Sequence, residues 1–331
     1  MKKILTLTLT AVLTLSVLTG CGSSEDKNLT KVTLSEVAHS IFYAPMYVAV
    51  EEGYFAEEDI DLELVTAFGA DKVTTAVISG EADIAFMGSE STIYVYNQNA
   101  DDYLVNFAQL TQRAGNFMVA REAMDDFDWK DLKGTYVLGG RKGGMPQMVF
   151  EYVLKKNGID PATDLTIDQS IDFGSTAAAF SGGKGDFTVE FEPSATALET
   201  ENAGYVVASL GEASGYVPYT AFSARKSYLE ENPEIIQSMT NALQKGMDYV
   251  NSHTPEEIAK IIQPQFAETD LEQITTIVKR YYDQDTWKEN LIFEQDAFEL
   301  LQDILTEAGE LENRVPYEAL VVKNFAESAA Q

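Results

Sequence analysis

Four loops run from a predicted strand into a predicted helix and have the composition of ligand-binding turns. They contribute these candidate ligand-binding residues: Gly69, Ala70 and Asp71; Gly88, Ser89 and Glu90; Gly143, Gly144 and Met145; and Glu192. A turn of this kind leaves the first backbone N–H groups of the helix exposed at the positive end of its dipole. Such groups bind a carboxylate, sulfonate, phosphate or carbonyl oxygen. The alternative is that the glycines only allow tight turns.

Two acidic residues of these loops, Glu90 and Glu192, occupy corresponding places along the chain. Each would accept a hydrogen bond from an amine or amide of a ligand. Alternatively, each complements the dipole of the helix that it begins. Aromatic residues gather near the first strand-to-helix junction and near a later return crossing. Among them we expect Tyr43, Tyr47 and Tyr216 to hold a flat heteroaromatic ring, although core packing is the alternative role.

The first junction also contains His39 and Pro45. Pro45 fits the first turn of a helix and so marks a further exposed helix start. His39 precedes that start and would donate or accept a hydrogen bond at the ligand site. As a lone histidine, it would equally serve as a satisfied structural residue.

The sequence contains no catalytic motif of the common classes. There is no Gly-x-Ser-x-Gly elbow, no His-Glu-x-x-His and no Walker-type Gly-Lys-Ser/Thr. Two histidines and one cysteine are too few for a transition-metal site. We therefore predict a protein that has no catalytic residues, no metal and no cofactor.

The charge balance excludes several classes of partner. With 53 acidic and 23 basic residues the formal charge is -30, so nucleic acid and anionic lipid headgroups would be repelled. The apolar fraction of 45% is what a well-packed globular core needs. The sequence thus favours a soluble ligand as the partner.

The elements that must position these loops alternate between strand and helix. Strand patterns fall at 32–37, 60–64, 83–87, 103–110, 116–120, 134–138, 167–171, 187–190 and 206–210. Helical patterns fall between them and take over after about residue 225, at 45–52, 71–79, 89–96, 146–157, 175–181, 193–201, 233–252, 255–263, 271–282 and 295–308. This alternation predicts an α/β protein with mostly parallel sheets.

Two blocks of this pattern look related. Residues 76–83 read Ala-Val-Ile-Ser-Gly-Glu-Ala-Asp and residues 179–186 read Ala-Phe-Ser-Gly-Gly-Lys-Gly-Asp. Each forms a helix end, a turn and a strand start, and each is soon followed by another helix start. The repeat predicts two similar lobes with their helix starts around one cleft, although so short a match also occurs by chance.

The N-terminus has the regions of an export signal. A basic start is followed by an apolar run at 4–17 and by Leu-Thr-Gly-Cys at 18–21. This last stretch resembles a bacterial lipobox, which implies removal of residues 1–20, lipid on Cys21 and a flexible leash at 21–30. The predicted location is extracytoplasmic, with the protein lipid-anchored to the membrane of a bacterium. The alternative is an ordinary signal peptide that leaves a free thiol.

Three motifs resemble those of a large family of ABC-importer substrate-binding proteins, which includes binders of sulfonates, taurine, nitrate and thiamine-pyrimidine precursors. They are His-Ser-Ile-Phe-Tyr-Ala-Pro-Met-Tyr-Val-Ala at 39–49 with Glu-Gly-Tyr-Phe at 52–55, Ser-Gly-Glu-Ala-Asp-Ile-Ala-Phe at 79–86, and Phe-Glu-Pro at 191–193. The resemblance implies a two-lobed periplasmic-binding-protein fold of type II, which closes on a small molecule and delivers it to a membrane permease. The expected lobes are 31–117 with 221–331, and 118–220, joined by hinge strands near 116–120 and 219–224. We expect a monomer.

The resemblance leaves several ligands open. A thiamine-pyrimidine precursor or a related heteroaromatic such as riboflavin is the first choice, and a sulfonate or taurine-type anion is the second. An enzymatic relative that makes the pyrimidine is a third possibility, in which Lys72 or Lys184 would hold pyridoxal phosphate. That relative carries a cysteine-rich motif, and this chain has a single cysteine.

Overall fold

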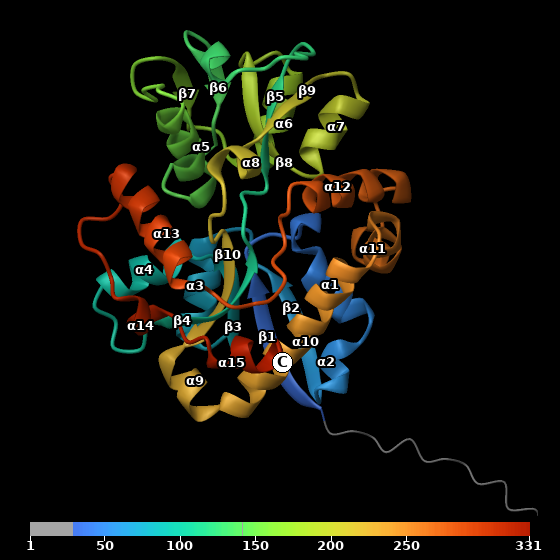
Figure 1. Ribbon diagram of the computed structural model, residues 1–331, viewed down its shortest axis with the longest axis vertical. Helices are drawn as coiled ribbons and strands as arrows, with labels where there is room; N and C mark the ends of the chain where they lie inside the picture. Colours follow the sequence, from blue (N-terminus) through green and yellow to red (C-terminus); the bar gives the residue numbers. More distant parts are fainter. Residues whose placement is uncertain (1–28, 141) are drawn as a thin grey trace, which may run out of the picture.

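The structure is a computed structural model that describes residues 29–140 and 142–331. The predicted signal peptide, the predicted lipidation site Cys21 and most of the predicted leash lie outside the described residues. The described chain contains two five-stranded sheets, one above the other along the long axis of the molecule (Figure 1). We call the lower sheet with its covering helices lobe 1, and the upper sheet with its covering helices lobe 2.

The sheet of lobe 1 has the strand order β2-β1-β3-β10-β4. Its strands are β1 (Thr30–Glu36), β2 (Ile60–Thr66), β3 (Ile84–Gly88), β4 (Leu104–Thr111) and β10 (Thr220–Arg225). Helices α3 (Ala70–Ser79) and α4 (Glu90–Asn97) cover one face, where Val73, Val77 and Val95 pack on Ala85 and Met87. Helix α1 (Ala44–Glu51) packs against α10 (Pro233–Ser252).

The sheet of lobe 2 has the order β7-β6-β8-β5-β9. Its strands are β5 (Asn116–Ala120), β6 (Tyr136–Leu138), β7 (Thr166–Asp168), β8 (Phe187–Phe191) and β9 (Tyr205–Ser209). Its helices are α5 (Met145–Lys156), α6 (Phe173–Ser181), α7 (Ser194–Thr200) and α8 (Leu210–Ser214). All five strands of this sheet lie in one continuous stretch of chain.

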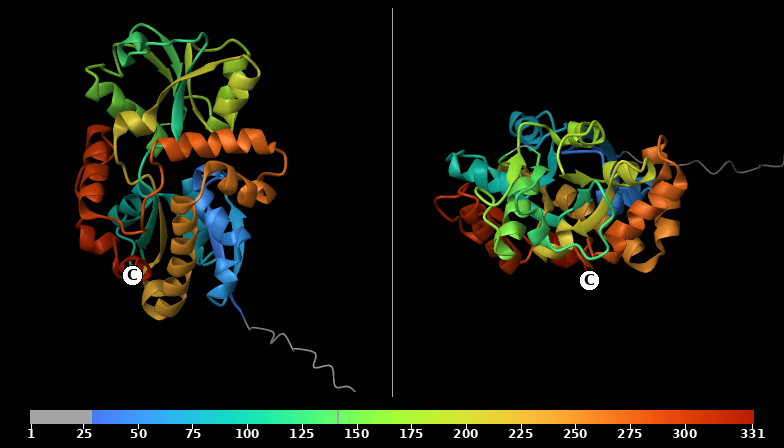
Figure 2. Two further views of the ribbon diagram at one scale, coloured as in Figure 1. Left: turned by 45° about the vertical axis from the view of Figure 1, so that its right-hand side comes forward. Right: turned by 90° about the horizontal axis from the view of Figure 1, so that it is seen from above.

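The remaining helices are short or belong to the C-terminal part of the chain. They are α2 (Tyr54–Glu57), α9 (Lys226–Glu231), α11 (Pro255–Ile262), α12 (Leu271–Asp283), α13 (Gln295–Glu307), α14 (Tyr317–Leu320) and α15 (Asn324–Ala329), with 3-10 turns at Ile41–Tyr43, Trp129–Leu132 and Gln263–Phe266. Helix α12 lies across the boundary between the lobes (Figures 1 and 2). The predicted change to a helical C-terminal part is confirmed.

The predicted repeat is confirmed by the topology. Both sheets contain the same order of three consecutive strands, β2-β1-β3 in lobe 1 and β7-β6-β8 in lobe 2, so that the second of the three lies at the edge, followed by the first and then the third. The aspartates of the two matched stretches make the same contacts. The Asp83 carboxylate accepts the Thr33 N–H at 2.9 Å, and the Asp186 carboxylate accepts the Tyr136 N–H at 2.8 Å. This aspartate connects the start of β3 to β1 in lobe 1 and the start of β8 to β6 in lobe 2.

The prediction of mostly parallel sheets is correct for four of the five strands of each sheet, which run in one direction, but each sheet also contains one antiparallel strand. β1 runs parallel to β2 and β3, and β6 runs parallel to β7 and β8. β10 runs antiparallel to β3 and β4, and β5 runs antiparallel to β8 and β9. The physical reason is that β5 and β10 each start just after the chain has crossed from the other lobe, so they enter their sheets from the opposite direction.

Gly246 on α10 allows the close approach of α10 to α1. A Cβ atom at this position would lie 2.1 Å from the carbonyl oxygen of Pro45 and 3.2 Å from the Cβ of Ala49. We expect Gly246→Ala to lower the free energy of unfolding by about 1–3 kcal/mol, the usual cost of overpacking. Urea unfolding would measure it. The matched control is Gly174→Ala on α6, where a Cβ would meet nothing within 4 Å, and no loss of stability is expected.

Candidate functional site

The four predicted loops all precede helices in the structure. α3 begins at Ala70, α4 at Glu90, α5 at Met145 and α7 at Ser194. Each loop follows the carboxyl end of a strand or, for α5, the glycine-rich segment after β6. In open α/β sheets this is the edge where ligands bind. The question is therefore which of these helix starts face each other.

The starts of α4 and α5 meet across the two lobes at Glu90. This side chain is 4% exposed, and its carboxylate accepts hydrogen bonds from the backbone N–H groups of Glu90 and Met145. Burial raises the pKa of the Glu90 carboxyl to about 7, against the opposing effect of these two donors. One carboxylate oxygen, Oε2, is buried without a hydrogen-bond partner in the described chain. Glu90 thus has unused capacity to accept a hydrogen bond.

Gly88 explains how the carboxylate reaches this place. A Cβ atom on Gly88 would lie 2.2 Å from Oε2 of Glu90, so only glycine lets the Glu90 side chain fold back over the end of β3. The preceding Ser89 is buried, and its hydroxyl donates to the carbonyl of Pro218 next to β10. These two residues hold the start of α4 in position.

Aromatic residues lie near this carboxylate. Burial raises the pKa values of Tyr43 and Tyr219, and the nearby Glu90 charge raises both further. Phe42 connects the two tyrosines, with ring centroids 5.3 Å from Tyr43 and 5.7 Å from Tyr219. The Tyr219 hydroxyl is buried without a hydrogen-bond partner in the structure as described. Tyr43, Glu90 and Tyr219 are therefore close neighbours.

Asn116, near these aromatic residues, is a further polar side chain without a hydrogen-bond partner in the described chain. It is fully buried at the start of β5, and neither its amide oxygen nor its amide nitrogen has a hydrogen-bond partner among the described residues. The preceding Gly115 packs against the Phe42 ring. We call Tyr43, Glu90, Asn116, Met145 and Tyr219 the central site. Buried polar atoms without partners are rare, and several together indicate a place where a ligand completes the hydrogen bonding.

His39 and Tyr47, two of the predicted ligand residues, lie in a separate hydrogen-bond network around Glu36. The Tyr47 hydroxyl donates to Glu36 Oε2 at 2.6 Å, and His39 Nδ1 lies 3.0 Å from Oε1. His39 Nε2 lies 2.8 Å from the carbonyl of Gln265. The hydrogen bond with Glu36 is the largest cause of the raised pKa of His39. Partners within the protein occupy both ring nitrogens.

Four further predicted regions make contacts with residues other than Glu90. Tyr216 is 54% exposed, its hydroxyl donates to Asp285 at 2.6 Å, and the Arg113 guanidinium lies 4.2 Å from its ring centroid. The Gly143 N–H donates to Gln147 Oε1 at 2.9 Å within the start of α5. Gly69 and Asp71 form the turn that begins α3, next to the exposed ring of Phe68. Pro45 is buried in the first turn of α1.

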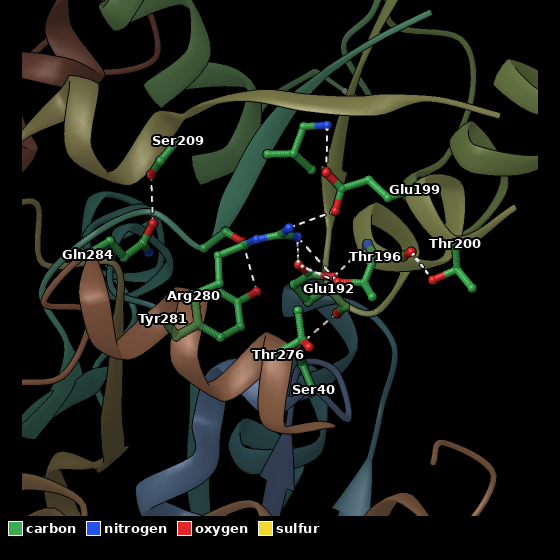
Figure 3. A network of polar contacts seen from close by, with 12 residues as sticks. Ser40, Glu192, Thr196, Glu199, Thr200, Ser209, Thr276, Arg280, Tyr281 and Gln284 are labelled. Atoms are coloured by element: carbon green, nitrogen blue, oxygen red, sulfur yellow. Dashed lines mark hydrogen bonds and ion pairs between the residues drawn. The ribbon is translucent and has the colours of Figure 1, made fainter. Parts of the chain in front are cut away.

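Glu192 makes contacts that sequence reasoning did not anticipate. Its carboxylate accepts the backbone N–H of Thr196 at 2.9 Å and pairs with Arg280 on α12 at 2.5 Å (Figure 3). Arg280 also pairs with Glu199 at 2.6 Å. Since β8 and α7 belong to lobe 2 and α12 lies across the boundary, this arginine ties α12 to lobe 2. The Glu192 side chain is fully buried, and its charge is balanced by this pair.

The residues do not fit a pyridoxal phosphate site. Lys184 is exposed and pairs with Asp168 at 2.6 Å, which raises the pKa of its ammonium group, and Lys72 is also exposed. A lysine that bonds this cofactor must be able to lose its proton inside a cavity. Within the described ranges no cluster of three or more metal-ligating side chains occurs. In the same ranges no helix has the length and apolar character needed to cross a membrane.

Comparisons with known proteins agree with this geometry. The chain is 46% identical to a Bacillus subtilis (strain 168) protein named "Putative binding protein YtlA" over 92% of its own length and 91% of that protein. Its structure is similar to the alkanesulfonate-binding protein SsuA of Xanthomonas axonopodis pv. citri, with a TM-score of 0.71 at 16% identity, over 88% of this chain and 98% of that one. It is also similar to the periplasmic nitrate-binding protein NrtA of Synechocystis PCC 6803, with a TM-score of 0.69 at 17% identity, over 91% and 88%.

The expected two-lobed periplasmic-binding-protein fold of the α/β class is confirmed by these structural likenesses. The NMT1/THI5-like family matches residues 41–258, which is well over half of the sequence. The resemblance stated from the three sequence motifs is confirmed as well. The chain belongs to the NMT1/THI5-like family.

Proposed function

We propose that the chain is the extracytoplasmic substrate-binding component of an ABC importer and has no reaction of its own. It captures a small heteroaromatic metabolite at the central site and delivers it to a membrane permease. A thiamine-pyrimidine precursor is the first candidate, and riboflavin is a related one. In this proposal the mature protein is a monomer held to the membrane by lipid on Cys21, with the lobe limits expected from the sequence.

The observation that carries the ligand class is the buried Glu90 carboxylate between the starts of α4 and α5. Its unpartnered Oε2 accepts a hydrogen bond, so a ligand with an amino group or ring N–H fits there. A hydrogen bond to an ionised carboxylate is about twice as strong as one between neutral groups. The rings of Tyr43 and Tyr219 supply an apolar, aromatic surface for the ring of the ligand.

A sulfonate is the second candidate, since it is what a structurally similar protein is named for. The positive ends of the α4 and α5 dipoles favour an anion, but an ionised Glu90 would repel it. Because the pKa of Glu90 is about 7, this repulsion is relieved only below neutral pH. The two candidates therefore differ in their expected pH dependence.

A ligand screen tests the proposal directly. We expect aminopyrimidines or flavins to raise the melting temperature of the purified protein at pH 8, where Glu90 is ionised. Taurine and alkanesulfonates should have no effect at that pH. Stabilisation by sulfonates alone would contradict the heteroaromatic ligand, and stabilisation by no small molecule would contradict the transport function. Denaturing mass spectrometry of the protein as purified would identify a ligand that was carried through.

A further inference from the structure

A second cavity lies beside the two crossing segments, which we define as residues 112–115 and 215–219. Its volume is about 400 Å³, within the range of pockets that hold small molecules. It is lined by Gln109, Gln112, Tyr216, Val217, Pro218, Lys288, Glu294, Asp296, Ala297 and Leu300. Pro218 separates it from the central site, because this residue lines the cavity while its carbonyl accepts the Ser89 hydroxyl.

The charged side chains that line this cavity are Lys288, Glu294 and Asp296. Lys288 is half-buried and forms no ion pair in the described part of the chain, and burial lowers the pKa of its ammonium group. The Glu294 and Asp296 side chains are exposed, and neither forms an ion pair or a side-chain hydrogen bond within residues 29–140 and 142–331. The cavity thus presents one positive and two negative groups, and Glu294 is near enough to Lys288 to raise the pKa of its ammonium group against the larger effect of burial. The half-buried Lys288 ammonium group is the costly one, because it has no ion-pair partner in the described chain and a bound anion would supply one.

The buried side-chain amide of Gln109 is a second, independent indication that a ligand binds here. Gln109 on β4 is 1% exposed, and its Nε2 donates to the carbonyl of Thr111 at 3.0 Å. Its Oε1 is buried and accepts no hydrogen bond from the described residues. Since Gln109 lines the cavity, a ligand that donates a hydrogen bond would satisfy this oxygen.

We propose that this cavity binds a free α-amino acid with an apolar side chain, as a zwitterion. The carboxylate of the amino acid pairs with Lys288. Its ammonium group donates to Gln109 Oε1 and to the carboxylate of Glu294. Its side chain packs against Val217 and Leu300. This site is separate from the central site and does not depend on the proposed transport function.

An amino acid bound in this cavity would affect how the lobes move, because the cavity lies beside both crossing segments. Gln112 belongs to one crossing segment, and Tyr216, Val217 and Pro218 belong to the other. A bound amino acid would contact both segments together with α13. It would therefore restrain the two connections through which the lobes move relative to each other.

Isothermal titration of the purified protein tests this site with L-alanine, L-valine and L-leucine. For the amino acid that binds best, we expect at least tenfold weaker binding of the analogue without the amino group and of the analogue without the carboxylate. For L-valine these analogues are 3-methylbutanoate and isobutylamine. No binding of any of the three amino acids, or equal binding of either analogue, would overturn the proposal.

Variants test whether the amino acid binds in this cavity or elsewhere on the protein. Lys288→Met and Glu294→Gln should each weaken amino-acid binding at least tenfold, while Lys279→Met, an exposed lysine on α12, should bind like the unchanged protein. Glu90→Gln should leave amino-acid binding unchanged, which distinguishes this cavity from the central site. Circular dichroism checks that each variant is folded. Unchanged affinity in both cavity variants would show that the amino acid binds elsewhere.

Discussion

Replacing Arg280 by methionine is expected to shift the protein from a closed toward an open arrangement of its lobes. The change leaves the buried Glu192 carboxylate without its positive partner and breaks the contact with Glu199. Leaving one member of a buried ion pair uncompensated costs about 3–5 kcal/mol. Opening of the lobes would relieve this cost, because water then reaches Glu192. The closed form should therefore lose up to about that amount of free energy relative to the open form.

Two measurements check this expectation. Small-angle X-ray scattering should give a larger radius of gyration for Arg280→Met, and the affinity for the central-site ligand should fall as the closed population falls. The matched control is Lys279→Met on the same helix. Lys279 forms an exposed pair with Asp283, and such pairs contribute only about 0–1 kcal/mol. If both variants scatter and bind like the unchanged protein, Arg280 does not hold the lobes together.

Glu90→Gln is expected to change both the pH dependence of stability and ligand binding. The folded protein holds the Glu90 carboxyl at a pKa of about 7, against the ordinary glutamate value of 4.5. The folded state therefore binds the proton more tightly than the unfolded state. It follows that stability is greatest below about pH 4.5 for this group and is lost as the pH rises through 7. The difference between these two pKa values corresponds to a loss of roughly 3 kcal/mol in the free energy of unfolding.

Urea unfolding of the ligand-free protein between pH 5 and 8 measures this effect. The Glu90→Gln variant should lose less stability across this range than the unchanged protein. Some pH dependence should remain, because burial also raises the pKa of Glu190 to about 7. The control is Glu81→Gln on an exposed turn, which should follow the unchanged protein. Parallel curves for Glu90→Gln and the unchanged protein would mean that Glu90 does not titrate in this range.

The same variant tests the role of Glu90 in recognition. An amide can accept a hydrogen bond but carries no charge, so the charge-assisted part of the contact is lost. We expect the dissociation constant of an aminopyrimidine or flavin ligand to rise about 10- to 100-fold, as for the loss of a hydrogen bond to a charged group. Calorimetry at pH 8 measures it. An unchanged dissociation constant would remove Glu90 from the central site.

The elements could be predicted from the sequence wherever local signals define them. Pro233 and Pro255 mark helix starts, and Gly80 ends α3 in the left-handed conformation, so these boundaries agree with the structure. The internal repeat also rests on a local pattern around Asp83 and Asp186. These features depend on residues near one another in the chain, which is why they can be read without coordinates.

Features that depend on distant residues could not be predicted. The pair of Glu192 with Arg280 joins residues 88 positions apart, and nothing near either residue indicates the other. The antiparallel direction of β5 and β10 follows from the path of the chain between lobes and has no local pattern. Asn116 was missed as a member of the central site. A polar residue at the head of the buried strand Asn116–Ala120 is the one signal that pointed to it.

The placement of β10 also determines the order in which the protein can fold. β10 lies between β3 and β4, although more than a hundred residues separate it from β4 in the chain. Lobe 1 therefore cannot close its sheet until residues 220–225 have been synthesised. The strands of lobe 2 lie together within 116–209, so their contacts form between nearer segments, which favours rapid folding. During synthesis from the N-terminus, lobe 2 is therefore the first part of the chain that can reach its final structure. Until β10 is made, β3 and β4 each have an unpaired edge, which a chaperone would need to protect.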